Sequence, residues 1–446
     1  MLETVKKSHQ SGTFFIWLCG AGLAVSLLMI IGLLLLVMIH GLPFFWPKDL
    51  IELSLKDGSR MLGELVDRET IPESITPDSL EGRSRIKLKV GNRDLYGQDF
   101  RWIEEDRIDA VAEPPDATVL ERREWGNFYG YFVGIHHRGT PVAGTPDELW
   151  ERFQHVLDEN NALVERIRHI ERDVIGDINY EIEQARLAIR EMELEGITDP
   201  ERRAALEATI AHQQRMYEQQ VHMLDDLRAR SMAYTVRMRE AGGQEIALPL
   251  GQIIRAVQPN RLSVFDKSLM ALANVWTVLS DEPREANTEG GLFPAIFGTV
   301  MMVLIMSVAV VPFGVLAAFY LREYAEQGFV IRAIRIAVNN LAGVPSIVFG
   351  VFGLGFFVYL VGGTIDTLFY PEALPTPTFG TGGILWASLT LALMTVPVVI
   401  VSTEEGLSAV PREYREGSLA LGATKFETMV KVVLPCAMPG ILTGLI

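Results

Sequence analysis

The sequence predicts an α-helical polytopic membrane protein that carries a large polar α+β domain between its first two membrane spans. Two observations lead to this fold class. Long stretches without a charged residue recur along the chain, and each can cross a hydrocarbon core of ~30 Å as a helix, which takes ~20 residues. Residues 47–290, by contrast, are rich in charged side chains. The uncharged stretches are residues 14–39, 291–321, 336–365 and 373–403.

Hydropathy predicts one N-terminal span and a C-terminal group of spans. The first span, within residues 14–46, is expected to be an uncleaved anchor, because Val25–Ile39 is almost unbroken Leu, Ile, Met and Val and no cleavage-site pattern follows. It separates a short tail, residues 1–13, from the polar domain. The expected membrane core, residues 291–446, has spans near 293–320, 337–362 and 382–402, a loop at 403–434, and the start of a further span at 435–446.

Lysine and arginine residues predict the orientation of the chain. They occur in the N-terminal tail, in the link 321–336 and in the loop 403–434, whereas the link 363–381 has none. The positive-inside rule therefore places the tail, the first of these links and the loop in the cytoplasm. By alternation, residues 47–290 and 363–381 lie outside, so we expect a multi-pass protein of a bacterial inner membrane with an extracytoplasmic domain.

Composition argues against several classes of function. Residues 47–290 hold 46 acidic and 31 basic residues, an excess that disfavours nucleic acid and anionic headgroups as partners. The two cysteines, Cys19 and Cys436, fall in apolar segments, so they cannot brace the polar domain. His136 and His137 have no further ligands at metal spacing. No nucleophile or zinc-protease motif occurs, and we expect no catalytic residue, no metal and no cofactor in this chain.

The polar domain is expected to combine short strands with one long helical hairpin. Residues 50–135 alternate apolar and polar side chains between turn signals, a pattern typical of β-hairpins. Residues 145–240 repeat apolar side chains at helical spacing, with a break where Asp199 suits an N-cap and Pro200 a first helical residue. We predict an antiparallel, coiled-coil-like hairpin of ~60–75 Å, and a strand-rich return over residues 241–262.

The loop 403–434 carries a spaced sequence pattern. The segment Glu416-Gly-Ser-Leu-Ala-Leu-Gly422 is followed, after nine residues, by Val432-Val-Leu434-Pro435. Pro411 suits a helix start, where the negative charge of Glu413 is favoured. The small side chains that follow let a short helix approach a partner closely, and Gly422 permits a sharp turn. The simpler interpretation is an ordinary amphipathic connector between two spans.

This pattern resembles the cytoplasmic signature of ABC importer permeases: Glu-Ala-Ala, three residues, Gly, nine residues, Ile, one residue, Leu-Pro. Every spacing matches, with Gly417 and Ser418 in place of the alanines and Val432 in place of isoleucine. The resemblance implies docking of a separate ABC ATPase dimer, whose closure pushes the short helix and switches the spans between outward- and inward-open. The implied docking residues are Glu416, Gly417, Ser418, Ala420, Gly422, Leu434 and Pro435.

ATP hydrolysis is expected in a partner chain. No G-x-x-x-x-G-K-[ST] phosphate loop occurs in this sequence. ATP and Mg²⁺ are therefore expected on the partner ATPase, and this chain is expected to be a transport subunit rather than an enzyme.

The later spans resemble the PstA-type permease subunit of the phosphate-specific transport system. The similarity covers residues 287–446 and implies inorganic phosphate as substrate, with a second homologous permease, an extracytoplasmic phosphate-binding protein and membrane lipid as partners. Asn339, Asn340, Pro345 and Ser346 are candidates for the substrate pathway, and a packed kink at Pro345 explains them equally well. The segments that carry the similarity are Asn287–Thr299, Leu321–Ala325, Asn339–Gly350 and Val396–Glu404.

Two other functions remain open. The chain could serve an importer of another oxyanion, such as sulfate or molybdate, or it could be a membrane-anchored sensor or docking protein that uses the acidic hairpin. The resemblance also implies an arginine-bearing span beyond Ile446. The chain is therefore expected to be C-terminally incomplete, with its phosphate-coordinating residues outside it.

Overall fold

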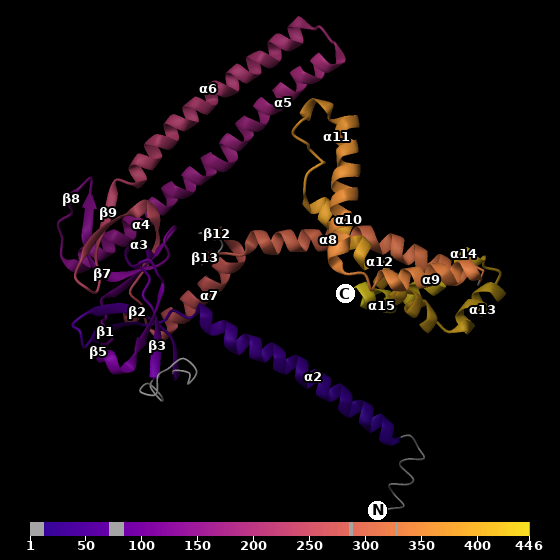
Figure 1. The fold of residues 1–446 in the computed structure, drawn as a ribbon, viewed down its shortest axis with the longest axis horizontal. Coiled ribbons are helices and arrows are strands. Elements are labelled where there is room, and N and C mark those ends of the chain that lie inside the picture. Colours follow the sequence, from indigo (N-terminus) through magenta and orange to yellow (C-terminus); the bar gives the residue numbers. More distant parts are fainter. Residues whose placement is uncertain (1–12, 71–83, 285–288, 327, 446) are drawn as a thin grey trace, which may run out of the picture. The chain divides into compact units, whose positions relative to one another are not determined.

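The computed structural model confirms the predicted fold class (Figure 1). Within the residues that it describes, five helices are long and apolar enough to cross a membrane, and antiparallel sheets follow the first of them. The chain separates into two units, residues 1–175 with 219–293, and residues 176–218 with 294–446. The predicted tail lies outside the described residues except for Thr13. The structure describes residues 13–70, 84–284, 289–326 and 328–445.

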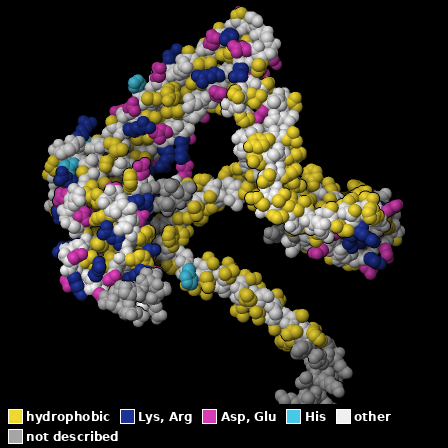
Figure 2. Space-filling model, viewed as in Figure 1, with side chains coloured by type: hydrophobic (Ala, Val, Ile, Leu, Met, Phe, Trp, Pro, Cys, Tyr) yellow, Lys and Arg dark blue, Asp and Glu magenta, His cyan; other side chains and the backbone are white. Residues whose placement is uncertain are grey.

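The first unit begins with an apolar helix. Helix α2 (Thr13–Gly41) has no charged residue, and hydrophobic side chains cover it along its length (Figure 2). A 3₁₀ turn, Leu42–Phe45, follows it directly. Because apolar side chains face outward on all sides, this helix suits lipid rather than water.

Two antiparallel sheets form the polar part of this unit. In the first sheet the strand order is β4-β3-β2-β1-β5, and in the second it is β10-β9-β7-β6-β11, with β8 beside β7. Leu50 and Leu62 of the first sheet pack with Ala117 and Tyr129 of the second. The strands are β1 (Leu50–Leu55), β2 (Arg60–Thr70), β3 (Ser84–Lys89), β4 (Phe100–Glu104), β5 (Ile108–Ala112), β6 (Ala117–Arg122), β7 (Phe128–His137), β8 (Thr140–Pro141), β9 (Tyr234–Arg239), β10 (Glu245–Pro249) and β11 (Ile253–Val257).

The helical hairpin leaves the second sheet and returns to it. Its outgoing arm is α4 (Pro146–His169), a π-helical turn and α5 (Ile175–Glu195), and its returning arm is α6 (Pro200–Ser231). Phe153, Val156 and Leu157 of α4 belong to the buried core of the second sheet. Farther out, α5 and α6 run side by side (Figure 1), with Arg203 3.1 Å from Glu193.

The hairpin differs from the prediction at both ends. Helix α4 packs on the sheet through Phe153 and Leu157 and on α6 only near its end, where Ile167 meets Leu224. Residues 234–239 are strand β9 instead of helix. The alternation of Tyr234-Thr-Val-Arg-Met-Arg239 explains this strand, because it lets β9 pair with β7 on one side and β10 on the other. Asp199 acts as predicted, accepting from the backbone N–H groups of Glu201 and Arg202 at 3.1 Å.

A helix that the sequence analysis did not predict closes the first unit. Helix α7 (Val264–Ser280) starts with a capping box between Ser263 and Asp266. The short strands β12 (Pro283–Arg284) and β13 (Glu289–Gly290) follow it. Helix α3 (Arg93–Tyr96) lies between β3 and β4.

The second unit contains the C-terminal helices. Helix α8 is followed by a π-helical turn, and α10, a long π-helical segment and α11 form one continuous span. The last span likewise joins α14, a π-helical turn and α15. The helices are α8 (Phe293–Phe319), α9 (Phe329–Leu341), α10 (Ser346–Gly353), α11 (Gly363–Phe369), α12 (Ile384–Ala409), α13 (Arg412–Ala420), α14 (Lys425–Thr428) and α15 (Leu434–Leu445).

Three predicted boundaries in this unit are wrong. The third span begins at Ser346 rather than near 337, because Pro345 disfavours helix in the residue before it and separates α9 from α10. The fourth span continues to Ala409. The last helix begins at Lys425 rather than 435, started by a capping box between Thr424 and Glu427. The predicted loop 403–434 therefore shrinks to α13 and its two flanking turns.

Candidate functional site

The candidate site is the short helix α13 between the last two spans. Pro411 occupies its N-cap position and Glu413 lies in its first turn. At its end, Gly422 donates to the Leu419 carbonyl at 3.0 Å and Ala423 to the Ser418 carbonyl at 3.2 Å, which is the Schellman pattern. Gly422 adopts φ +88°, a left-handed conformation that favours glycine.

Helix α13 leaves most of the sequence-predicted docking residues open to solvent. Glu416, Gly417, Ala420 and Gly422 are exposed. A Cβ added at Gly417 would meet no atom of this chain within 4 Å. The described part of the chain therefore leaves most of α13 uncovered, with the small residues Gly417 and Ala420 among its exposed positions.

Ser418 faces the other way. Its hydroxyl lies 2.9 Å from the Thr428 hydroxyl, and Thr428 is fully buried at the end of α14. Leu434 packs against a cluster that includes Leu407 and Val433, while Pro435 is exposed. The structure thus brings Ser418 against the last span, and it gives Leu434 a packing role there.

Arg415 fastens α13 to the ends of two spans. Its guanidinium donates to the Leu407 carbonyl of α12 at 2.7 Å and lies 3.1 Å from the Glu323 carboxylate after α8. Lys425 donates to the Glu323 carbonyl, and its ammonium lies 4.8 Å from the centre of the Tyr324 ring. These contacts join α13 and α14 to the end of α8.

A second ion pair joins α9 to α12. The Arg335 guanidinium lies 3.3 Å from the Glu404 carboxylate and donates to the Leu321 carbonyl at 3.2 Å. The pairing of Arg335 with Glu404 and of Arg415 with Glu323 was not predicted from the sequence. The available signal for Arg335, Glu404 and Glu323 was that each lies within two residues of a long uncharged stretch, where an unpaired charge is costly. Arg415 carried no such signal.

Comparisons with known proteins identify this part of the chain. Residues 310–446 match the family model of the binding-protein-dependent transport system inner membrane component. They form a permease domain. The chain is also similar to the phosphate transport system permease protein PstA 1 of Mycobacterium tuberculosis, at 37% identity over 157 residues, which is 35% of this chain and 45% of the relative.

Further relatives agree with this family. The probable phosphate transport system permease protein PstA of Methanocaldococcus jannaschii is 34% identical over 36% of this chain and 50% of its own length. The phosphate transport system permease protein PstC of Xylella fastidiosa is 32% identical over 40% of this chain and 57% of its own length. The chain thus spans about half the length of the curated relatives it matches.

The permease domain is packed closely around small residues. A Cβ on Gly440 of α15 would lie 2.7 Å from the Gly406 Cα of α12, so the two helix backbones nearly touch. A Cβ on Gly314 of α8 would lie 2.6 Å from Val399 of α12. Small residues at such crossings let membrane helices approach closely.

The predicted pathway residues lie at the junction of α9 and α10. Asn339 and Asn340 belong to the last turn of α9, and Pro345 and Ser346 begin α10. All four are exposed. Pro345 therefore starts a new helix, and the alternative of a kink within one continuous span is wrong.

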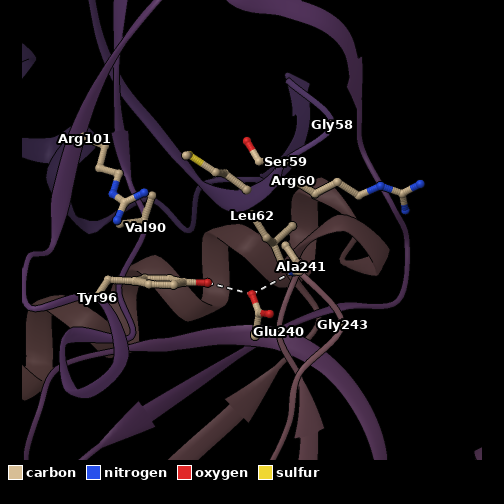
Figure 3. A pocket seen from close by; sticks show the side chains of 12 residues that line it. Gly58, Ser59, Arg60, Leu62, Val90, Tyr96, Arg101, Glu240, Ala241 and Gly243 are labelled. Carbon is tan, nitrogen blue, oxygen red and sulfur yellow. Dashed lines mark hydrogen bonds between the residues drawn. The ribbon is translucent and has the colours of Figure 1, made fainter. Parts of the chain in front are cut away.

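A cavity in the polar part of the first unit offers a different type of site. It has a volume of about 500 Å³, and in Figure 3 Tyr96 and Glu240 point toward each other across it, while Arg60 points away. The Tyr96 hydroxyl donates to Glu240 at 2.7 Å, as does the Gly242 N–H. Burial and this bond raise the pKa of Tyr96. The Glu240 carboxylate already accepts these two bonds, so its role here is to stabilise the turn after β9.

Metal ligands do not gather in the part of the chain that the structure describes. Residues 13–70, 84–284, 289–326 and 328–445 contain no cluster of three His, Cys, Asp or Glu side chains able to hold an ion.

Proposed function

We propose that this chain is a permease subunit of an ATP-driven ABC importer for inorganic phosphate in a bacterial inner membrane. The observation that carries the proposal is the exposed helix α13, whose Glu416–Gly422 segment has the signature spacing and lies within a permease domain. The similarity to proteins named phosphate permeases supports phosphate as the substrate.

In this proposal, α13 receives a partner ATPase dimer, which binds ATP and Mg²⁺. Closure of the dimer pushes α13, and Arg415 passes the movement to α8 and α12 through Glu323 and Leu407. Ser418 passes it to the last span through Thr428. The spans then switch between outward- and inward-open, together with a second homologous permease.

The proposed orientation follows the distribution of lysine and arginine. The N-terminal tail, the link 321–336 and α13 face the cytoplasm, where the ATPase operates. Residues 47–290 then lie on the opposite side, where an extracytoplasmic phosphate-binding protein delivers the ion.

The substrate is tested by stimulation of ATP hydrolysis. The complete transport system, assembled with this subunit in vesicles, is mixed with its binding protein loaded with phosphate, sulfate or molybdate. We expect the phosphate-loaded form alone to stimulate hydrolysis. Stimulation by another oxyanion and not by phosphate would identify a different oxyanion importer.

A further inference from the structure

Helix α7 exposes a continuous apolar face. Its large apolar side chains recur at spacings of 4, 3, 4 and 3 residues, which places them on one side of the helix. Each is between 49 and 76% exposed. The only charged residues of α7 are Asp266 and Lys267, at its start. The members of this face are Phe265, Leu269, Leu272, Trp276 and Leu279.

The opposite side of α7 is fixed to the rest of the first unit. The Asn274 side chain donates to the Phe45 carbonyl at 3.0 Å and accepts from Arg255 of β11 at 2.9 Å. The buried Lys267 pairs with Asp49, just before β1. These bonds prevent the helix from rolling its apolar face inward.

These contacts place α7 beside the end of α2. Phe45 closes the 3₁₀ turn that follows α2. Phe44 and Trp46 are exposed in the same short segment, and aromatic side chains are enriched where a protein leaves the hydrocarbon. The chain also enters its next apolar helix soon after α7, at Phe293. Helix α7 therefore contacts the end of one span, α2, and shortly precedes the start of the next, α8, along the chain.

Length and direction argue against a transmembrane α7. Its 17 residues fall short of the ~20 that a span needs, and one side carries bonded polar groups. In Figure 1 it does not run parallel to α2. A helix with one apolar and one polar side, next to a span, suits the boundary between headgroups and acyl chains.

We propose that α7 is an interfacial helix that inserts its Phe265–Leu279 face into the bilayer surface where α2 leaves the membrane. Lipid is the occupant because the bond from Asn274 to Phe45 places α7 at the end of α2, which lipid must already surround. Insertion relies on apolar burial, since the polar part of the first unit is acidic and has no attraction for anionic headgroups. The helix would hold the sheets of this unit at a fixed height above the membrane.

Site-specific fluorescence quenching tests the proposal. The full chain, with Cys19→Ala and Cys436→Ala, carries a single bimane label at Leu272→Cys in neutral phosphatidylcholine nanodiscs. Nitroxide-labelled lipid and aqueous iodide serve as quenchers. The matched control is Leu194→Cys in the hairpin, a leucine that is 57% exposed against 68% for Leu272.

We expect the Leu272 label to be quenched several-fold more by the nitroxide lipid, and several-fold less by iodide, than the Leu194 label. Leu269→Cys, on the same face, should give the same result. Iodide quenching equal to that of Leu194 would overturn the proposal, since the face would then be in water. Protection from both quenchers would also overturn it, since a protein partner would then cover the face.

Discussion

Gly422 matters both for the fold of helix α13 and for the function proposed for that helix. Its φ of +88° ends α13 through the Schellman bonds, yet a Cβ there would meet nothing within 4 Å. Backbone conformation, rather than space, therefore restricts this position. A β-branched residue in the left-handed region costs roughly 1–3 kcal/mol.

We predict that Gly422→Val uncouples ATP hydrolysis from phosphate uptake, because the strained turn shifts α13. Gly422→Asn should keep most of the coupling, because asparagine tolerates the left-handed region. The measurement is phosphate imported per ATP hydrolysed in the complete system. Gly417→Ala, a change within the helix, is the control, and normal coupling in the Val variant would contradict the prediction.

Glu121 makes the first unit sensitive to acid. Its carboxylate lies 2.9 Å from Arg255 and 2.7 Å from Arg284. Burial acts to raise the pKa of Glu121, but the two guanidinium groups outweigh it and hold the pKa below the ordinary value of 4.5. The stabilisation is therefore complete above pH 4.5, and it is lost as the pH falls through the lowered pKa.

We expect the unfolding temperature of this unit to fall as the pH drops below about 4.5, with part of the fall due to Glu121. Glu121→Gln should lower stability at neutral pH and flatten the dependence on pH. Thermal melts of the full chain in detergent, followed by circular dichroism of the sheets, measure both effects. If the unfolding temperature of Glu121→Gln falls with pH as steeply as that of the unchanged chain, other carboxyl groups account for the fall.

At the scale of elements, the closest crossing is that of α12 and α15. Gly440→Leu should destabilise the permease domain, because the added side chain enters the backbone of Gly406; overpacking typically costs 1–3 kcal/mol. Gly350→Leu is the matched control in α10, where a Cβ would meet nothing within 4 Å. The measurement is the temperature at which each variant aggregates in detergent. Equal aggregation temperatures for Gly440→Leu and Gly350→Leu would contradict this packing.

The elements also show what the sequence could predict. The apolar stretches were sufficient to predict the spans, and the break at Asp199 was sufficient to predict the hairpin, because both signals are local in the sequence. The separation of α9 from α10 was signalled only by Pro345 inside an uncharged stretch, so hydropathy merged the two helices. The last span was placed from 435 because its uninterrupted apolar sequence begins there, whereas the helix already begins at Lys425 with a capping box.

Other features depend on tertiary contacts that no local pattern reports. The spacing of Phe265, Leu269 and Leu272 was a visible helical signal for α7, but only the bonds of Asn274 show which side faces the sheets. Likewise, the spacing of Glu416 and Gly422 located the candidate site. The pairing of Arg415 with Glu323, 92 positions earlier in the chain, required the fold.

At the scale of the whole molecule, the hairpin can be shortened without touching the packed clusters near its base, although buried Ile182, Ala185 and Met192 are removed from between the arms. Removing Ile182–Met192 and Ala204–Gln214 deletes about three turns from each arm and keeps its faces aligned. The Glu193–Arg203 tip and the cores around Phe153 and Leu224 remain. Removing all of residues 145–240 would instead delete α4 and β9.

We expect the shortened chain to fold and phosphate uptake to persist, because the proposed transport function belongs to residues 293–446. Uptake and resistance to proteolysis are measured together, with the full-length chain as the control. Loss of uptake with an intact fold would tie the hairpin to transport.

The docking of a partner on α13 is the central claim, and Gly417 tests it most directly. A Cβ there would meet no neighbouring element of the described chain within 4 Å, and the position is exposed, so a leucine chiefly changes what an outside partner encounters. Gly382→Leu, equally free of neighbours, is the control. Copurification of the ATPase with each variant is the measurement. We predict that the ATPase no longer copurifies with Gly417→Leu but still copurifies with Gly382→Leu. If Gly417→Leu retained the ATPase fully, α13 would only connect two spans and would not be the docking site.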